Sequence, residues 1–372
     1  MRIDKSTVSG TRFMFAIAFY LQASALLTSF LAGITKLESW IPLMLGFVLF
    51  LPFIYLYRTL MLMFPEQNYL QVLCEVFGTI TGKIIGIFYL WFFLTLTALN
   101  VRDIGAFVNI SILPETPNVV TMLCCVLVSV WAVRHGFKVV ARYSSMFTII
   151  EFLIVAVSII LVSNQIKLSN FRPLFAQSFG KYVQGTHIIA TIPFGELVIF
   201  LMVMPCVRKL SRREATQFWF CGAAMGFIVL LAVLLRDIAI LGNALPLFTL
   251  PGLVTLRLVN LNEALSRMEI IFTVAIMMLL FFKITILIYV STIAVAQLFE
   301  TTHFKRLALI VSAFILAYVP TLYPSSVEHT ISARTIEPVI WTVFEMILPL
   351  MTFIVAKLRR LPRVVVAERW EK

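Results

Sequence analysis

The chain has 372 residues, of which 61% are hydrophobic and only 13% are charged, and its mean hydropathy is +0.99. A soluble domain is roughly half apolar and about a quarter charged, so this composition excludes one. Lipid is the expected solvent, and only helices or closed barrels satisfy their backbone polar groups within lipid. The apolar runs are helix-length, about 20 residues, and lack the alternation of barrel strands, which favours helices.

Ten apolar runs predict ten membrane helices. They cover about residues 13–33, 40–58, 83–101, 118–134, 143–163, 186–206, 217–241, 270–298, 307–323 and 337–356. Two amphipathic segments, about 67–78 and 258–268, are expected to lie along the membrane interface.

The net charge of +12 is explained by the distribution of Lys and Arg between alternate loops. An even number of spans places both termini on one side of the membrane, together with every second loop. Twenty basic residues fall in that set of segments and nine in the other, while Lys283 lies inside a predicted helix. Cytoplasmic loops carry the excess of Lys and Arg, so both termini, including a basic tail of about residues 357–372, are expected in the cytoplasm.

Other classes of protein find little support in the sequence. The basic residues lie at the ends of apolar runs, and not in polar loops interleaved with aromatic residues, which argues against nucleic acid as a partner. Five cysteines and four histidines lack the spacing of a zinc site or a disulfide framework. No P-loop, HExxH or G-x-S-x-G motif is present, so neither an enzyme nor a cofactor is expected.

Ten helices divide into two sets of five within a single polytopic domain. Because five is odd, a second half built like the first enters the membrane from the opposite side, which is the inverted-repeat arrangement of many secondary transporters. The predicted repeats are about 13–163 and about 186–356. The fold class expected is therefore all-α, with helices 1 and 6 broken near the middle of the membrane.

The break in helix 6 is predicted at Thr191-Ile192-Pro193-Phe194-Gly195-Glu196. Proline removes a backbone donor and clashes with the preceding turn, and glycine adds no side chain that holds a helix. Unwound backbone at this depth is tolerated where it lines a cavity, and its amides offer a site for a small zwitterion. An ordinary proline kink, with Glu196 paired or neutral, is the alternative.

Helix 1 carries the partner break at about residues 20–25, with Gln22, Ala23 and Ser24 at its centre. Small residues also occur wherever two helices pack closely, so packing is the alternative explanation. The candidate ligand-binding residues are Gln22, Ala23, Ser24, Thr191, Pro193, Phe194 and Gly195.

Lys283 lies too deep in helix 8 to reach the interface easily, and an intramembrane lysine is a functional candidate. Glu196 and Lys283 are therefore candidates for charge coupling or gating. Lys283 could pair with Glu196 or with a substrate carboxylate, or it could stand where a sodium-coupled transporter would hold its cation. A fixed structural pair with Glu151 or Glu345 is the alternative. Arg236 and Asp237 are expected to neutralise each other, and Arg102 and Asp103 to lie at the interface.

These motifs resemble those of the B subunit of spore germination nutrient receptors, a branch of the amino acid-polyamine-organocation superfamily. The resemblance runs almost from end to end. Its residues are the Gln22 segment, Trp40-Ile41, Leu113-Pro114-Glu115-Thr116-Pro117, Gly136-Phe137, Ala141-Arg142, Pro193-Phe194-Gly195-Glu196, Arg267 and Phe282-Lys283. Family members usually have glycine directly after the helix-1 glutamine, whereas this chain has Ala23, which leaves the identity of the ligand open.

The resemblance implies a leucine-transporter-like core that binds a nutrient, typically an amino acid, at the breaks in helices 1 and 6. It also implies a complex with an A subunit and a lipoprotein C subunit in the spore inner membrane, where binding triggers germination. A proton-coupled amino acid transporter on the same scaffold is the alternative, and a structural scaffold for partner subunits is a third hypothesis. Fold alone does not separate sensors from carriers.

Overall fold

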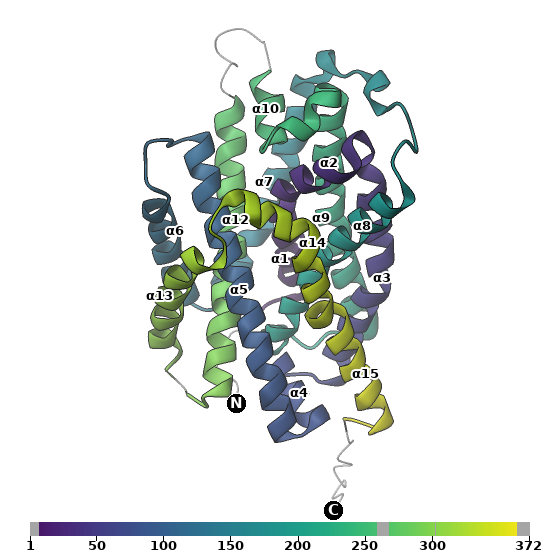
Figure 1. Ribbon diagram of the computed structural model, residues 1–372. Helices are drawn as coiled ribbons and strands as arrows, with labels where there is room; N and C mark the ends of the chain where they lie inside the picture. The colour runs from purple at the N-terminus through teal and green to yellow at the C-terminus, as the bar shows by residue number, and fades with distance from the viewer. Residues whose placement is uncertain (1–6, 259–267, 302, 363–372) are drawn as a thin grey trace, which may run out of the picture.

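Long apolar helices dominate the structure, a computed structural model that describes residues 7–258, 268–301 and 303–362 (Figure 1). Eight helical stretches in these ranges are long and apolar enough to cross a membrane: Trp40–Met63, Thr79–Ser111, Phe137–Leu161, Phe179–Met202, Arg212–Leu247, Ile270–Leu298, Phe304–Leu322 and Ser326–Leu358. A pair bent by 48°, Gly10–Ala25 and Phe30–Glu38, forms a ninth candidate span. The shorter apolar helix Asn118–Val133 completes a set that follows the ten predicted spans in order.

The helices keep the following labels. In chain order they are α1 (Gly10–Gln22), α2 (Thr28–Thr35), α3 (Trp40–Met63), α4 (Tyr69–Phe77), α5 (Thr79–Ser111), α6 (Asn118–Val133), α7 (Phe137–Leu161), α8 (Phe179–Ile189), α9 (Arg212–Leu241), α10 (Pro251–Arg257), α12 (Met268–Leu298), α13 (Phe304–Leu322), α14 (Ser326–Thr342) and α15 (Leu348–Leu358).

Local sequence explains several of the helix ends. Gly78 and Gly136 have φ angles of +91° and +86°, in the region that glycine tolerates without steric cost, and they separate α4 from α5 and α6 from α7. Ser211 begins α9 with a capping box, because its side chain accepts from the Glu214 N–H and Glu214 accepts from the Ser211 N–H. The two glycines thus allow sharp turns between helices, and the capping box pairs one of the first amides of α9.

Several spans are longer than hydropathy predicted. The helix expected at 83–101 covers Thr79–Ser111, the helix expected to begin at 143 begins at Phe137, and the last span begins at Ser326 and not at 337. Polar residues at these helix ends lower the local hydropathy, but some of them, such as His329, Ser332 and Glu337, are buried within the protein. Arg102 and Asp103, which were predicted at the membrane interface, lie inside α5 and line a cavity.

The two predicted amphipathic segments have different outcomes. Residues 69–77 form α4, which is too short to span a membrane and buries Tyr69, Leu73 and Val76 within the helical bundle. The segment predicted at 258–268 lies outside the described residues except for its two end positions.

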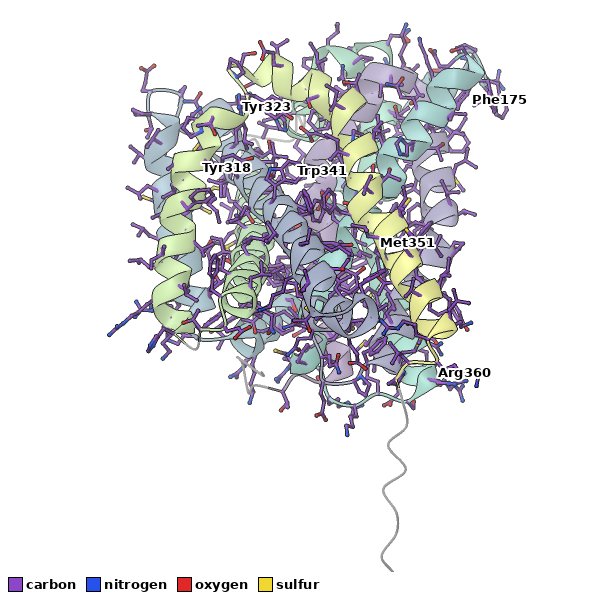
Figure 2. The ribbon with its side chains drawn as sticks, turned by 60° about the horizontal axis from the view of Figure 1, so that its bottom comes forward. Phe175, Tyr318, Tyr323, Trp341, Met351 and Arg360 are labelled. Atoms are coloured by element: carbon purple, nitrogen blue, oxygen red, sulfur yellow. The ribbon has the colours of Figure 1, made fainter. Side chains whose placement is uncertain are left out.

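Hydrogen bonds place both ends of the described chain at one end of the bundle. The Val8 N–H donates to the Cys206 carbonyl over 2.7 Å, and Arg58 at the end of α3 donates to the Arg212 carbonyl at the start of α9. Arg359, after α15, donates to the carbonyl of Val76 in α4. Figure 2 shows the neighbouring Arg360 at this end and Phe175 at the opposite end.

Candidate ligand-binding site

The predicted break in helix 6 is present. α8 ends at Ile189, and a single π-helical turn, Ala190–Phe194, leads into a 3-10 helix, Gly195–Met202. Ile192 has non-helical angles of φ −106° and ψ 106°, immediately before Pro193, which has no N–H to donate. The chain therefore crosses the middle of the bundle with its α-helical hydrogen bonding interrupted.

Helix 1 is broken at a corresponding place. α1 ends at Gln22, a 3-10 segment spans Ala23–Leu27, and α2 continues from Thr28. The 3-10 segment contacts both α12 and the π-helical turn of helix 6. The two breaks thus meet inside the bundle, beside the helix that carries Lys283.

Lys283 binds both broken helices. Its Nζ lies 2.7 Å from Glu196 Oε2 and donates to Ser24 Oγ over 2.9 Å. Tyr20 OH donates to the same Glu196 oxygen over 2.8 Å, and the ammonium lies 4.9 Å from the centre of the Tyr20 ring. Both charged side chains are at most 3% exposed. Of the partners considered for Lys283, Glu196 is the one that pairs with it in the structure. Together with the hydrogen bonds to Ser24 and Tyr20, this pair connects α12, helix 6 and helix 1.

Glu345 lies on the other side of the helix-6 break. It belongs to a π-helical turn, Val343–Ile347, between α14 and α15, and it is fully buried. Neither of its carboxyl oxygens has a hydrogen-bond partner among the described residues. A Cβ on Gly195 would lie 2.2 Å from Glu345 Oε2, so the missing side chain of Gly195 makes room for this carboxyl group.

A cavity of about 150 Å³ lies between the breaks and the helices around them. Pockets for drug-sized ligands measure about 300–1,000 Å³, so this one suits a smaller molecule. Ile110 and Ser326, near the ends of α5 and α14, are exposed and mark its opening, away from the end that holds the chain termini. The lining includes Ala23, Ser24, Phe30, Asn100, Arg102, Asp103, Phe107, Ile192, Glu196, Thr249, Lys283, His329, Glu337 and Trp341.

The predicted ligand-binding residues fall into two groups. Ala23 and Ser24 line the cavity, together with Glu196 and Lys283. Gln22, Thr191, Pro193, Phe194 and Gly195 are fully buried beside it and do not line it.

The residues outside the lining have other neighbours. The Thr191 hydroxyl donates to the carbonyls of His187 and Ile188. Phe194 packs against Phe47 and Phe50, with ring centres 5.3 and 6.1 Å away. Neither amide atom of Gln22 finds a hydrogen-bond partner within the described part of the chain.

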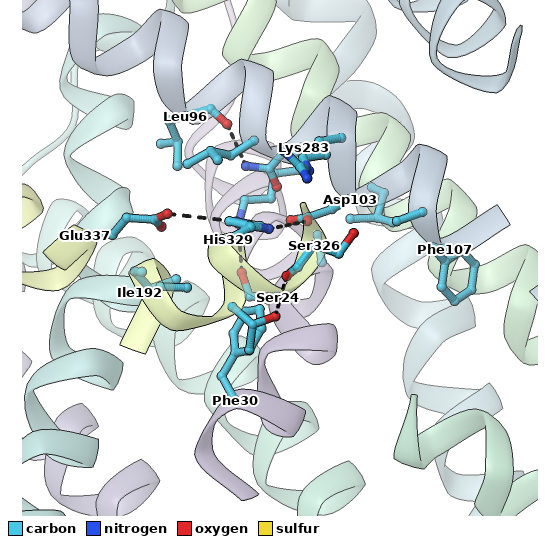
Figure 3. Close-up of a pocket in the computed structure, with 18 of the residues that line it drawn as sticks. Ser24, Phe30, Leu96, Asp103, Phe107, Ile192, Lys283, Ser326, His329 and Glu337 are labelled. Atoms are coloured by element: carbon cyan, nitrogen blue, oxygen red, sulfur yellow. Dashed lines mark hydrogen bonds and ion pairs between the residues drawn. The ribbon is translucent and has the colours of Figure 1, made fainter. Parts of the chain in front are cut away.

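Sequence reasoning missed four ionisable residues in the lining: Asp103, His329, Glu337 and Arg102. The available signal was their position in or next to apolar runs, where an ionisable residue usually faces the protein interior. The helix predicted to end at 101 left Asp103 in a loop. The last helix, predicted to begin at 337, left His329 in a loop. Figure 3 shows His329 between the two carboxylates.

A second buried ion pair lies on α9. Arg236 donates from Nε and Nη2 to Asp237 Oδ1 over 3.0 and 2.8 Å, and from Nη1 to Ser158 Oγ over 2.7 Å. Its guanidinium also lies 5.4 Å from the centre of the Phe272 ring. The expectation that Arg236 and Asp237 neutralise each other agrees with this geometry.

Sequence comparisons point to one family. The family model described as "Spore germination protein" matches residues 7–327. Over 349 residues the chain is 27% identical to spore germination protein KB of Bacillus subtilis (strain 168), covering 92% of each chain. It is 23% identical over 336 residues to the putative spore germination protein YfkT of the same organism, covering 88% of this chain and 89% of the relative.

Solved structures with the same fold are membrane transporters. The nucleobase-cation-symport-1 family transporter Mhp1, in a closed conformation with bromovinylhydantoin bound, superposes with a TM-score of 0.66 at 12% identity, over 98% of this chain and 81% of its own. A manganese transporter from Eremococcus coleocola superposes with a TM-score of 0.59 at 14% identity, over 94% and 84%. These likenesses confirm the predicted all-α, inverted-repeat membrane fold.

Proposed function

This chain belongs to the spore germination protein family, and we propose that it is the membrane subunit of a germinant receptor that senses a small nutrient, an amino acid, and triggers germination. The observation that carries the proposal is the small cavity where the two broken helices meet, which is lined by charged and polar side chains as well as apolar ones. At its wall, Lys283 from α12 contacts both Ser24 from helix 1 and Glu196 from helix 6. A zwitterion that enters the cavity therefore meets both signs of charge.

Binding acts by shifting the population of conformations. Lys283 holds the breaks together through Glu196 and Ser24, so a ligand that contacts any of these groups favours one arrangement of the two broken helices over another. A ligand moves such an equilibrium only by its difference in affinity for the two states. In the proposed receptor this difference supplies the germination signal.

Partner subunits receive that signal in the proposed complex. We expect an A subunit and a lipoprotein C subunit, assembled with this chain in the spore inner membrane, with both of its termini in the cytoplasm. The distribution of charge supports the orientation, because Arg58, Arg208, Lys209, Arg212 and Arg359 lie in segments at the end of the bundle that holds the termini.

The test is to measure binding and transport on the same full-length protein in lipid vesicles. Each labelled common amino acid is offered to the reconstituted chain, and equilibrium binding and time-dependent accumulation are recorded. A receptor subunit binds at least one of them saturably and accumulates none. Because Lys283 ties the site together, Lys283→Met is expected to abolish binding, while circular dichroism reports whether the helices persist.

The rival functions give different results in this experiment. Sustained accumulation of an amino acid with movement of protons identifies a proton-coupled transporter. Unchanged assembly and germination in spores that carry both Lys283→Met and Glu196→Gln identify a scaffold. Saturable binding without accumulation supports the receptor, and co-purification of two further subunits from spore membranes supports the proposed complex.

A further inference from the structure

Beyond the Lys283–Glu196 pair, the cavity contains a row of three ionisable side chains. His329 Nδ1 lies 3.8 Å from Asp103 Oδ1, and His329 Nε2 lies 3.9 Å from Glu337 Oε1 (Figure 3). Asp103 comes from α5, and the other two come from α14. The row therefore crosses the cavity between two helices, on the side nearer its opening.

Aromatic and polar neighbours hold the row in position. The Tyr323 hydroxyl donates to Glu337 Oε1 over 2.8 Å, and the Tyr323 ring stacks on His329 with ring centres 5.3 Å apart. Arg102 donates from Nη1 to the carbonyl of Tyr323 over 2.8 Å. Both distances from His329 to the carboxylates exceed hydrogen-bond length, so the imidazole separates the carboxylates without bonding to either one.

The charges of the lining leave these carboxylates short of a cation. The lining contains three carboxylates, Asp103, Glu196 and Glu337, and two permanent cations, Arg102 and Lys283. Lys283 is already paired with Glu196, and Arg102 donates to a carbonyl. The lining therefore contains one more carboxylate than permanent cation, and Glu337, at 5% exposure, lies where an unpaired charge is costly.

Trp341 provides a second, independent sign of a missing occupant. It lines the same cavity at 2% exposure, and its indole N–H has no acceptor among the residues that the structure describes. Buried Trp N–H groups usually find a partner. An occupant that carries both a cation and an acceptor oxygen would satisfy the carboxylates and the indole together.

The missing cation is better explained by an organic ammonium than by a metal ion. Within the described ranges, no group of three or more His, Cys, Asp or Glu side chains is arranged to hold a metal. The aromatic rings of Phe30 and Phe107 also line this part of the cavity, and aromatic faces attract ammonium groups.

We propose that Asp103 and Glu337, held apart by His329 across the cavity, form the ammonium subsite of the ligand. The proposal rests on the function proposed above and narrows it. The ligand is an amine-bearing nutrient that binds with its nitrogen toward α5 and α14, while the rest of the molecule lies toward the helix breaks.

The decisive experiment compares ligands on the unaltered full-length protein. Each common amino acid is tested for binding, and those that bind are compared with their N-acetyl and 2-hydroxy-acid analogues, which lack the ammonium. Glucose and adenosine serve as uncharged probes. We expect the analogues to bind at least about tenfold more weakly, because they lose a charged hydrogen bond to the carboxylates.

Variants then identify the residues responsible. Asp103→Asn and Glu337→Gln each remove one charge at nearly constant shape, and each is expected to weaken binding of the same amino acid about tenfold. Glu300→Gln removes one charge from an exposed loop and is the matched control, with unchanged affinity expected. The unfolding temperature of each variant checks that the bundle is intact.

The possible outcomes separate this subsite from the function on which it rests. If the analogues bind as tightly as the amino acid, amino acid sensing stands and the ammonium subsite is overturned. If only glucose or adenosine binds, the protein still binds a nutrient, but the proposed amino acid ligand and the ammonium subsite are both overturned. Unchanged affinity in both Asp103→Asn and Glu337→Gln overturns it as well. If the folded protein binds none of the probes, the proposed sensing function fails and the subsite fails with it.

Discussion

Two buried ion pairs between permanently charged residues, both in the part of the chain that the structure describes, join very different parts of the sequence. Arg236 and Asp237 are neighbours on α9, and Arg236 adds a hydrogen bond to Ser158 of α7. Lys283 and Glu196 are 87 positions apart and connect α12 to both broken helices. The Arg236–Asp237 pair lies within one helix, so it stays intact when neighbouring helices move. The Lys283–Glu196 distance, in contrast, changes whenever the broken helices move relative to α12. Only the second pair is placed to report on a ligand.

The largest effect is expected when the pair at the breaks loses its cation. Lys283→Met leaves Glu196 buried without a counter-charge, and breaking a buried pair in this way costs about 3–5 kcal/mol of stability. Denaturant unfolding of the purified protein in detergent measures the loss. The double variant Lys283→Met with Glu196→Gln removes both charges and should recover part of it. A single variant as stable as the parent would contradict a buried ionic interaction at this place.

The pair on α9 should behave differently. Asp237→Asn removes the partner of Arg236, which keeps Ser158 and the Phe272 ring, so we expect the stability loss near the lower end of that range, about 3 kcal/mol. The affinity for any amino acid that binds the parent protein should stay within about twofold, a difference of less than about 0.5 kcal/mol. A tenfold loss of affinity in Asp237→Asn would show that the two pairs are coupled and would end the distinction between them.

Gly195 tests how tightly the chain is packed beside Glu196. A Cβ at this position would meet the Glu345 carboxyl, so Gly195→Ala should cost about 1–3 kcal/mol through overpacking. Gly180, near the start of α8, has no heavy atom within 4 Å of its virtual Cβ, and Gly180→Ala is the matched control. Glu345→Ala in the Gly195→Ala background should restore part of the stability. Equal unfolding midpoints for the two glycine variants would contradict the close approach of Glu345.

Hydropathy and proline chemistry were sufficient to predict the bundle and its breaks. The helix-6 break follows from Pro193 and Gly195 alone, because neither residue supports an α-helix there. The order of the spans follows from apolar runs, which dominate the free energy of insertion into lipid. The positions of proline and glycine and the apolar runs are local properties, so a single sequence is enough to predict these features.

The neighbours of individual side chains were much less predictable. The sequence offered Glu196, Glu151 and Glu345 as possible partners for Lys283. Which of them pairs with Lys283 depends on how helices that are distant in the sequence rotate against each other. Phe194 was expected at a ligand, yet it packs in a cluster of aromatic rings. Such contacts depend on tertiary packing, which has no signature in local composition.

A third ion pair, Lys83–Glu300, is exposed to solvent and is expected to contribute least to stability. Lys83 Nζ lies 2.6 Å from Glu300 Oε1, but the side chains are 42% and 72% exposed. The hydrogen bond from Lys83 lowers the pKa of Glu300, so any stabilisation is present above the ordinary carboxyl pKa and is lost as pH falls through the lowered value. Solvent and salt screen such pairs, and many contribute nothing measurable.

We therefore expect Glu300→Gln to leave the unfolding midpoint unchanged at neutral pH, in both low and high salt. Melting curves of the parent and the variant at pH 7 and at about pH 4, near the ordinary glutamate pKa, make the measurement. Should Glu300→Gln destabilise the protein as much as Asp237→Asn does, burial would not be what separates the three pairs, and the stronger role given to Lys283 and Glu196 would lose its physical basis. An unchanged midpoint leaves burial, and connection across the helix breaks, as the properties that distinguish the Lys283–Glu196 pair.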